Sequence, residues 1–232
     1  MIFSPHAQHS VEWMQARAGI PTASEFGNLV SDTFEIRKGE MPKTYLAKKL
    51  AEAWLGGSLA EFSSWDMDQG TILEEEAIPW FEFEHGVKVD RVGLITTDDG
   101  RIGASPDGLL GDGLVNNAGL EIKCPRIETH IKYLLKGGLP AEYGPQVHGG
   151  MLVTDMPMWT FVSYSRRLPK LVLSVTRDEK IQAVLQEALG VFQAGFEKGW
   201  EKLCDMNGGP PKKRKDEPIP EIKPEPELTY LQ

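Results

Sequence analysis

The chain has 232 residues, of which 41% are hydrophobic and 25% are charged, a composition typical of a globular protein with a substantial core. Its formal net charge of −9 excludes nucleic-acid binding by overall positive charge, so a DNA-binding surface would have to gather its basic residues locally. Two cysteines are too few for a disulfide framework, a four-cysteine zinc site or an iron–sulfur cluster. With no secretory-signal pattern and no membrane-length apolar run, we expect a cytoplasmic protein.

The N-terminal part of the chain is typical of helices. Ser10 is a candidate N-cap before residues 11–19, and residues 22–25 (Thr-Ala-Ser-Glu) predict a capping box that opens a second helix through Val30. Residues 42–55 predict an amphipathic third helix, because apolar side chains recur there every four residues. Its apolar stripe contains Leu46, Leu50 and Trp54. Its basic side contains Lys43, Lys48 and Lys49.

A helix is also predicted over residues 69–85, although Pro79 should kink it or mark its true start. After residue 86 the apolar period changes from helical to alternating, and Gly, Asp and Asn divide the chain into short segments. This pattern predicts a block of strands over residues 87–95, 101–104, 107–110 and 118–124.

The remaining third of the chain mixes both kinds of element. The pattern predicts helices over residues 127–136 and 141–154, then a hairpin of strands over residues 159–164 and 171–176. A second capping box, at residues 176–179, predicts a long helix that ends near Cys204. We therefore expect an α+β fold with a mixed sheet in one domain, residues 1–207. Residues 208–232 are rich in Pro, Glu and Lys and predict a flexible or docking tail.

The strand block carries the residues best suited to chemistry. Asp107 lies in a tight Ser-Pro-Asp-Gly turn, and Glu121 and Lys123 are two residues apart, so they share one face of a strand. Ile122 points the other way, which leaves its carbonyl beside the acids. Two carboxylates and a carbonyl are the hard oxygen ligands that Mg²⁺ or Mn²⁺ prefers. A lysine beside them suits metal-assisted hydrolysis of a phosphodiester.

Each of these pieces also has a purely structural explanation. Pro-Asp-Gly is a common turn signal, and Glu-x-Lys occurs in many exposed strands, so we interpret neither as functional by itself. Their combination within one strand block, with a helix following, favours a catalytic site.

The Pro-Asp…Glu-x-Lys pattern resembles the PD-(D/E)xK nuclease superfamily. More narrowly, the chain resembles the phage lambda exonuclease group, also called YqaJ-type viral recombinases. The resemblance runs from Trp13 to about Arg177 through several blocks in the same order. These blocks are residues 13–17, 22–25, 70–74, 81–87, 105–109, 120–125 and 146–154. It implies the α/β/α-like core of that superfamily, with helices on both sides of a mixed sheet.

The resemblance implies an enzyme that loads on an end of double-stranded DNA. Such an enzyme digests one strand from 5′ to 3′ and leaves a 3′ overhang, which a single-strand annealing protein coats for recombination. It also implies a homotrimeric ring with DNA in its channel, in a bacterial or phage-infected cell. A ring suits an acidic protein because only its channel has to be basic. Candidates for the channel wall are Lys43, Lys48 and Lys49.

By the same resemblance, Asp107, Glu121 and the Ile122 carbonyl would bind two Mg²⁺ ions, with Mn²⁺ as a substitute, and Lys123 would position the attacking water. Glu74 would complete the metal site, although only the resemblance selects it over the acids at 75 and 76. The glutamine motif of the superfamily matches Gln146. Arg17 and Ser24 would hold the 5′-phosphate, because guanidinium groups and helix N-termini bind phosphate. Further DNA contacts are expected at Trp13 and Ser105.

Two other functions stay open on the sequence alone. One is a sequence- or structure-specific endonuclease of the same superfamily, which would cut circular DNA. The other is a DNA-binding recombination scaffold with an inactive site, against which the intact acid and lysine set argues. The basic run at residues 212–215 resembles a nuclear-localisation signal, which we interpret as coincidence. It fits a DNA or partner contact and a solvated linker equally well.

Overall fold

A computed structural model describes the backbone of residues 1–59, 65–111 and 116–211, and the side chains of these residues except 65–72 and 116. Most of the predicted tail, residues 212–232, therefore lies outside the described part. A five-stranded sheet forms the centre of the fold, in the order β2 (Val89–Asp90), β5 (Gly108–Gly111), β6 (Asn116–Lys123), β7 (Met158–Ser163) and β8 (Leu171–Thr176). Only the β6–β7 pair of this sheet is parallel. The predicted mixed sheet and α+β class are confirmed.

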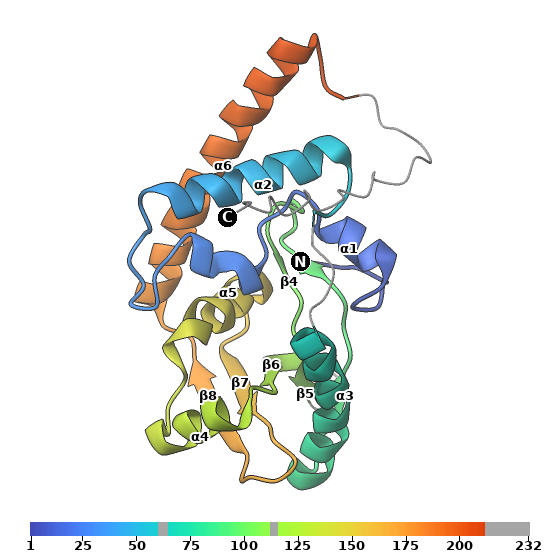
Figure 1. Ribbon diagram of the computed structural model, residues 1–232, viewed down its shortest axis with the longest axis vertical. Coiled ribbons are helices and arrows are strands. Elements are labelled where there is room, and N and C mark those ends of the chain that lie inside the picture. Colours follow the sequence, from blue (N-terminus) through green and yellow to red (C-terminus); the bar gives the residue numbers. More distant parts are fainter. Residues whose placement is uncertain (60–64, 112–115, 212–232) are drawn as a thin grey trace, which may run out of the picture.

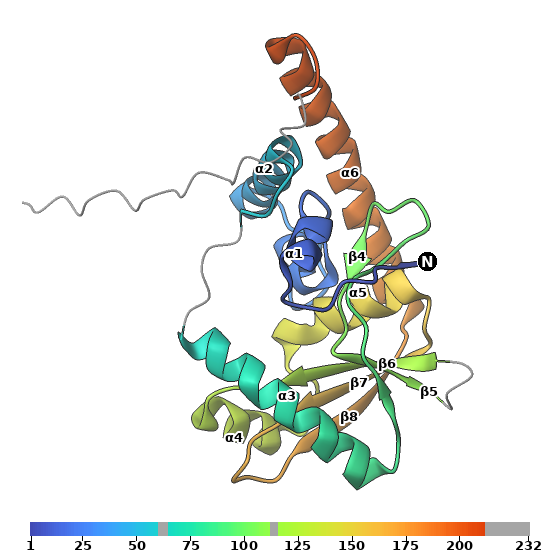
Figure 2. The ribbon, with the colours of Figure 1, turned by 90° about the vertical axis from the view of Figure 1, so that its right-hand side faces the viewer.

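Helices cover both faces of this sheet (Figures 1 and 2). On one face, α3 (Trp65–His85) packs Ile78 and Phe81 against Ile122 of β6. On the other face, α5 (Gly144–Thr154) packs against β7, where Trp159 and Phe161 are buried. The alternation along β6 follows from these two layers. Ile122 enters the α3 layer, so Glu121 and Lys123 lie on the α5 side.

A second layer of helices packs above α5 and builds the largest apolar cluster. It contains the 3₁₀ helix η1 (Ala23–Asn28), α2 (Glu40–Leu55) and α6 (Glu179–Asn207), whereas α1 (Val11–Arg17) contributes no residue to this cluster. Helices α2 and α6 contact one another through Tyr45 with Phe192 and through Trp54 with Trp200, each pair 5.4 Å apart between ring centroids. The C-terminal half of α6 projects beyond the rest of the molecule (Figure 1). None of the helices in the described ranges is long and apolar enough to cross a bilayer.

The single strand predicted over residues 87–95 is divided between two sheets. Its first part is β2 of the central sheet, whereas β3 (Ile95–Thr96) pairs with β1 (Ile2–Phe3) and β4 (Gly103–Ala104) in a small separate sheet. Between the two, the chain passes closely against the N-terminal segment. A Cβ atom at Gly93 would lie 2.0 Å from the His6 carbonyl oxygen, so a side chain is excluded there. The local alternation of apolar and polar residues cannot reveal that the chain passes from one sheet to the other here.

Several predicted element boundaries are confirmed and two capping boxes are wrong. Ser10 caps α1 by accepting the Trp13 N–H, and α4 (Ile127–Lys136) has its predicted limits. Residues 141–154 divide into a short 3₁₀ helix, η2 (Ala141–Tyr143), and α5. Thr22 makes no side-chain cap, and the helix after it is η1 rather than an α-helix. The N-cap of α6 is Asp178, which accepts from Lys180 and Ile181. Helix α3 continues through Pro79, so the proline does not mark its start.

Trp159 packs between two glycines, and this contact leads to a prediction about the stability of the fold. A Cβ atom at Gly150 or at Gly119 would lie 2.4 Å from the Trp159 ring. We therefore expect Gly150→Ala to lower the free energy of unfolding by roughly 1–3 kcal/mol, a drop of about 3–10 °C in melting temperature. Gly190→Ala is the matched control, because a Cβ atom added to this glycine of α6 would have no neighbour within 4 Å. It should be neutral or slightly stabilising. Equal melting temperatures for the two variants would contradict the packing argument.

Candidate active site

Asp107 and Glu121 lie on adjacent antiparallel strands. The Asp107 N–H donates to the Leu120 carbonyl at 2.9 Å, and the Ile122 N–H donates back to Asp107 Oδ2 at 2.6 Å. The next residue, Gly108, allows β2 to pack closely, since a Cβ atom there would lie 2.1 Å from Val89 Cγ1. The Pro-Asp-Gly sequence is therefore both a strand start and the support that holds this carboxylate beside β6.

Glu121 is the centre of a buried polar cluster on the α5 side of β6. It is 2% exposed, and its Oε1 lies 2.6 Å from Lys123 Nζ. Gln146, near the N-terminus of α5, donates to the same oxygen from Nε2 at 2.5 Å. The three residues expected to act together at positions 121, 123 and 146 are thus brought together by one strand face and one helix.

Helix α3 contributes the third carboxylate. Its three consecutive acids point to different partners, which separates Glu74 from its neighbours. Glu75 forms a two-pronged ion pair with Arg91, at 2.9 and 2.7 Å. Glu76 accepts from the Tyr164 hydroxyl at 2.8 Å and from Arg166 Nε at 2.7 Å. Glu74, in contrast, lies beside Asp107, on the wall of a cavity that Glu75 also lines.

The charges in this cluster interact strongly. Burial, together with the Asp107 charge, raises the pKa of Glu74 to about 7. Burial also raises the pKa of Glu121 to about 8, against the opposing effect of Lys123, and it raises the pKa of Asp107. Burial alone would lower the pKa of Lys123, but the charges of Glu121 and Asp107 raise it above its usual value. Three carboxylates facing one ammonium leave a site short of positive charge.

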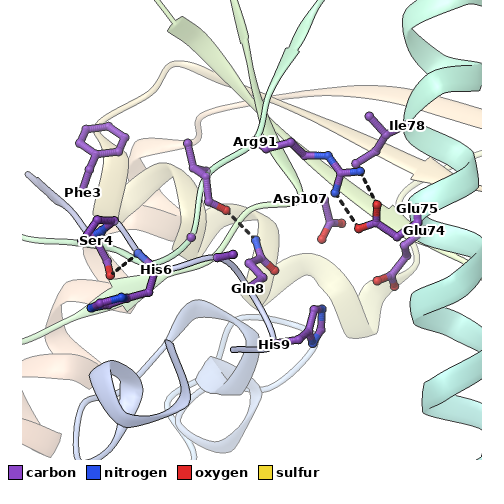
Figure 3. Close-up of a pocket in the computed structure, with 14 residues that line it drawn as sticks. Phe3, Ser4, His6, Gln8, His9, Glu74, Glu75, Ile78, Arg91 and Asp107 are labelled. Atoms are coloured by element: carbon purple, nitrogen blue, oxygen red, sulfur yellow. Dashed lines mark hydrogen bonds and ion pairs between the residues drawn. The ribbon is translucent and has the colours of Figure 1, made fainter. Parts of the chain in front are cut away.

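Glu74 and Asp107 open into a cavity of about 490 Å³ (Figure 3). Its other walls are Arg91 and the N-terminal segment, and Figure 3 shows the His9 ring directed toward the two carboxylates. Gln8 holds that segment in place by donating from Nε2 to the Pro106 carbonyl at 2.7 Å and to the Val92 carbonyl at 3.0 Å. The sequence does not predict this wall, because nothing in the pattern around residue 9 indicates a contact with the strand block.

A second polar cluster surrounds Arg17 at the end of α1. Arg17 Nη2 donates to Thr22 Oγ1 and to Ser24 Oγ, both at 3.1 Å. Its guanidinium carbon lies 4.2 Å from the centre of the Trp13 ring, and Trp13 Nε1 donates to Ser105 Oγ at 3.1 Å. The four residues expected to meet the substrate here are thus in mutual contact. Nothing in the sequence pattern predicts this contact of Thr22, which the pattern assigns to a helix cap.

The two clusters border one narrow gap of about 10 Å³, which has room for about one water molecule. Its lining includes Ser24 and Ser105 from the second cluster, and Glu121 and Gln146 from the first. A group bound by Arg17 and Ser24 would therefore lie next to the buried carboxylates.

Comparison with known families identifies this arrangement. The YqaJ-like viral recombinase domain matches residues 12–157, a segment that contains both polar clusters. The chain belongs to this family. The resemblance inferred from the sequence is confirmed.

Solved structures place this YqaJ-family chain among exonuclease folds. LHK-Exo in complex with dAMP is 32% identical with a TM-score of 0.76, and the match covers 86% of this chain and 98% of that one. A structure of the alkaline exonuclease LHK-Exo from Laribacter hongkongensis is 31% identical with a TM-score of 0.75 over the same shares. A phage-related exonuclease from Haemophilus somnus 129PT shares the fold at 14% identity and a TM-score of 0.62, covering 79% of this chain and 96% of that one. A comparison with curated protein sequences finds no match.

The donor set of the YqaJ-family site fits divalent cations. Glu74, Asp107 and Glu121 supply carboxylate oxygens of the kind that Mg²⁺ and Mn²⁺ bind, and burial raises the pKa of each against the opposing charge of Lys123. The described residues do not by themselves form a ligand cage of three or more acidic, His or Cys side chains. Asp107 is held by Ile122, and Glu121 by Lys123 and Gln146. Metal binding would therefore have to draw the carboxylates together.

The three lysines expected in the DNA channel lie in different environments. Lys43 is exposed and pairs with Glu40 at 2.8 Å, and Lys48 is about half-buried against Glu25 at 2.9 Å. Lys49 is only 3% exposed, and it forms ion pairs with Glu25 and Glu52. The expected DNA contact is therefore wrong for Lys49, because its ammonium is sealed between carboxylates inside the protein.

The lysines around Glu25 predict a dependence of stability on pH. Burial alone would raise the pKa of Glu25, but Lys49 and Lys48 lower it to about 2. Because the folded-state pKa lies below the unfolded value, this carboxylate stabilises the fold above about pH 4.5 and loses that contribution as the pH falls toward 2. We expect Glu25→Gln to lose on the order of 2–3 kcal/mol of unfolding free energy at pH 7.

Urea unfolding of wild type and Glu25→Gln between pH 2 and pH 7 measures this contribution. The difference in unfolding free energy should shrink between pH 4.5 and pH 2, because protonation removes the same charge from the wild type. A difference that stays constant across this range would contradict the assignment.

Proposed function

We propose that this protein is a Mg²⁺-dependent exonuclease that digests one strand of linear duplex DNA from 5′ to 3′ and leaves a 3′ overhang. Its coarser identity, a deoxyribonuclease of the exonuclease kind, follows from membership of the YqaJ family and from its likeness to LHK-Exo. What we propose beyond this identity is the Mg²⁺ dependence, the 5′-to-3′ polarity and the 3′ overhang.

One observation carries the polarity. The Arg17 cluster and the buried Glu121 border the same narrow gap, with Ser24 and Ser105 on one side and Glu121 on the other. A guanidinium with two hydroxyl neighbours suits a terminal phosphate, since charge-assisted hydrogen bonds favour phosphate oxygens. A strand anchored there by its 5′-phosphate would present an adjacent phosphodiester to the carboxylates, so cleavage would proceed from the 5′ end.

The residues of the site have separate roles in hydrolysis. Two divalent ions held by Glu74, Asp107, Glu121 and the Ile122 carbonyl would supply charge neutralisation and activation of water at the scissile phosphate. Gln146 and Lys123 orient the Glu121 carboxylate by binding its Oε1 atom. The ammonium of Lys123 also stays protonated beside these acids, where it can hold the attacking water and offset negative charge on the phosphate.

The partners that this function implies are also proposals. A single-strand annealing protein would coat the 3′ overhang, and a homotrimeric ring would keep the enzyme on its DNA. Such a ring suits a net charge of −9, because only its channel has to be basic. Of the three lysines considered for that channel, Lys43 has the exposure that a DNA contact requires.

Digestion of linear duplex with labelled 5′ or 3′ ends tests the proposal. We expect early release of the 5′ label, faster digestion when the 5′ end is phosphorylated, and no digestion in EDTA. Supercoiled circular DNA should remain intact, because it has no end to load on. Cutting of the circle would support the endonuclease alternative, and binding without any digestion in Mg²⁺ would support an inactive scaffold.

A further inference from the structure

A buried group of charges lies directly behind the Arg17 cluster. Lys49 of α2 places Nζ 2.8 Å from Glu25 Oε2 and 3.0 Å from Glu52 Oε2. Glu52 and Lys49 are 2% and 3% exposed, whereas the Glu25 side chain is 22% exposed, so the triad is largely shielded from water. Burying three charges is expensive, and well-packed apolar side chains often serve stability as well or better. The triad therefore leaves room for a role besides stability.

The triad ties α2 to the loop that carries the phosphate cluster. Glu52 Oε2 accepts the Gly19 N–H at 3.0 Å. Gly19 has φ +79°, and a Cβ atom there would lie 2.8 Å from Ala53 Cβ, so the loop is pressed onto α2. Glu25, at the other end of the loop, accepts from the Tyr45 hydroxyl at 3.3 Å as well as from Lys49.

Thr22 connects the triad to Arg17. Its hydroxyl donates to Glu25 Oε2 at 3.3 Å and accepts from Arg17 Nη2 at 3.1 Å. A hydroxyl has one proton, so donation to Glu25 turns its lone pairs toward the guanidinium. The position of the Glu25 carboxylate, set by Lys49, thereby determines the orientation of Arg17.

The charges of the triad also keep Arg17 free for substrate. An unpaired Glu25 carboxylate this close would compete with a phosphate for the guanidinium. Lys49 and Lys48 each occupy one oxygen of Glu25, at 2.8 and 2.9 Å, and Thr22 separates it from Arg17. The loop thus combines a fixed geometry with a guanidinium whose charge is available.

We propose that Lys49, together with Glu25 and Glu52, is a positioning element that holds Arg17 and Ser24 in the geometry for recognising a 5′-phosphate. This inference rests on the proposed function, because it assigns the Arg17 cluster to the terminal phosphate. It replaces the surface role expected for Lys49 with an indirect role in choosing DNA ends.

The test compares digestion of linear duplex with 5′-phosphate and 5′-hydroxyl ends by full-length wild type, Lys49→Met and Thr22→Val. The ratio of kcat/KM on the two ends should fall about three- to tenfold in both variants. Thr22→Ser, which keeps the hydroxyl, should retain the wild-type ratio. Lys198→Met is the matched control. It removes one ammonium from an exposed position of α6, outside the triad and the Arg17 cluster, so the ratio should stay unchanged.

Binding in EDTA gives a readout that does not need catalysis. The preference for a 5′-phosphorylated over a 5′-hydroxyl duplex end, measured as a ratio of dissociation constants, should fall by the same factor. If Lys49→Met does not fold, Tyr45→Phe takes its place, because it removes one anchor of Glu25 and keeps the ring that packs on Phe192. The preference of Tyr45→Phe for 5′-phosphorylated over 5′-hydroxyl ends should then be measurably lower than that of wild type.

The possible outcomes distinguish a failure of the proposed function from a failure of this inference alone. A wild type with no preference for phosphorylated ends overturns the phosphate role of Arg17, and this inference with it. A wild type with that preference, kept in folded Lys49→Met or Thr22→Val, overturns the inference alone. A purely structural triad would lower the rates on both kinds of end equally and leave the ratio unchanged.

Discussion

Asp107→Asn and Glu121→Gln should abolish digestion of linear duplex DNA, with rates lower by on the order of a thousandfold or more. Each change removes one carboxylate charge from the set that faces Lys123, so divalent ions would lose a ligand and phosphate charge would go uncompensated. Both amides keep the shape of the side chain, and the amide oxygen introduced by Asp107→Asn can still accept the Ile122 N–H. The fold should therefore survive.

The measurement is the single-turnover rate in saturating Mg²⁺, with melting temperature as the control for folding. Glu76→Gln is the matched control, because this acid of α3 binds Tyr164 and Arg166 outside the carboxylate cluster. It should digest DNA at close to the wild-type rate. If Glu121→Gln kept most of the wild-type activity, the catalytic assignment would be wrong.

Arg17→Ala should lose the preference for 5′-phosphorylated ends by roughly ten- to a hundredfold, because a charge-assisted bidentate contact contributes about 1.5–3 kcal/mol. Arg17→Lys should rescue only part of the preference, since an ammonium lacks the planar fork and stacks less well on Trp13. Processivity should also fall, because each new end would no longer be held after a nucleotide leaves.

The ratio of digestion rates on the two kinds of end measures this effect. Arg17 is more enclosed than a surface residue, and burial lowers the pKa of its guanidinium, so we expect Arg17→Ala to cost about 1 kcal/mol of stability. Melting temperature checks that the protein is still folded. An unchanged ratio in folded Arg17→Ala would remove the phosphate role and favour the endonuclease alternative.

Local patterns were sufficient for the centre of the site. Glu121 and Lys123 share a strand face because side chains alternate along any strand, and Ile122 between them has to enter the core. Asp107 lies beside them because two short strands separated by turns pair as neighbours. The Ser10 cap and the hairpin of β7 and β8 follow from equally local signals.

The second cluster shows where local patterns fail. The sequence Thr-Ala-Ser-Glu predicted a capping box, but Thr22 makes no side-chain cap. Its hydroxyl donates to the Glu25 carboxylate and accepts from Arg17, and Glu25 pairs with Lys49. A hydroxyl and a carboxylate have several acceptable partners, and the choice among them depends on α2, which lies about twenty residues further along the chain. The resulting helix is η1 rather than an α-helix.

The sequence by itself determined the α+β class, the strand that carries Glu121 and Lys123, and, through resemblance, the nuclease family. These features depend on periodicity and on short motifs, and both involve residues that are close together in the sequence. The family resemblance had selected Glu74, and the tertiary structure supplied the reason, since Glu75 and Glu76 pair with Arg91 and Arg166. Only the tertiary structure decided that Lys49 is buried. The reason is physical: whether a charged side chain meets water, a partner or a cavity depends on which distant elements pack against it.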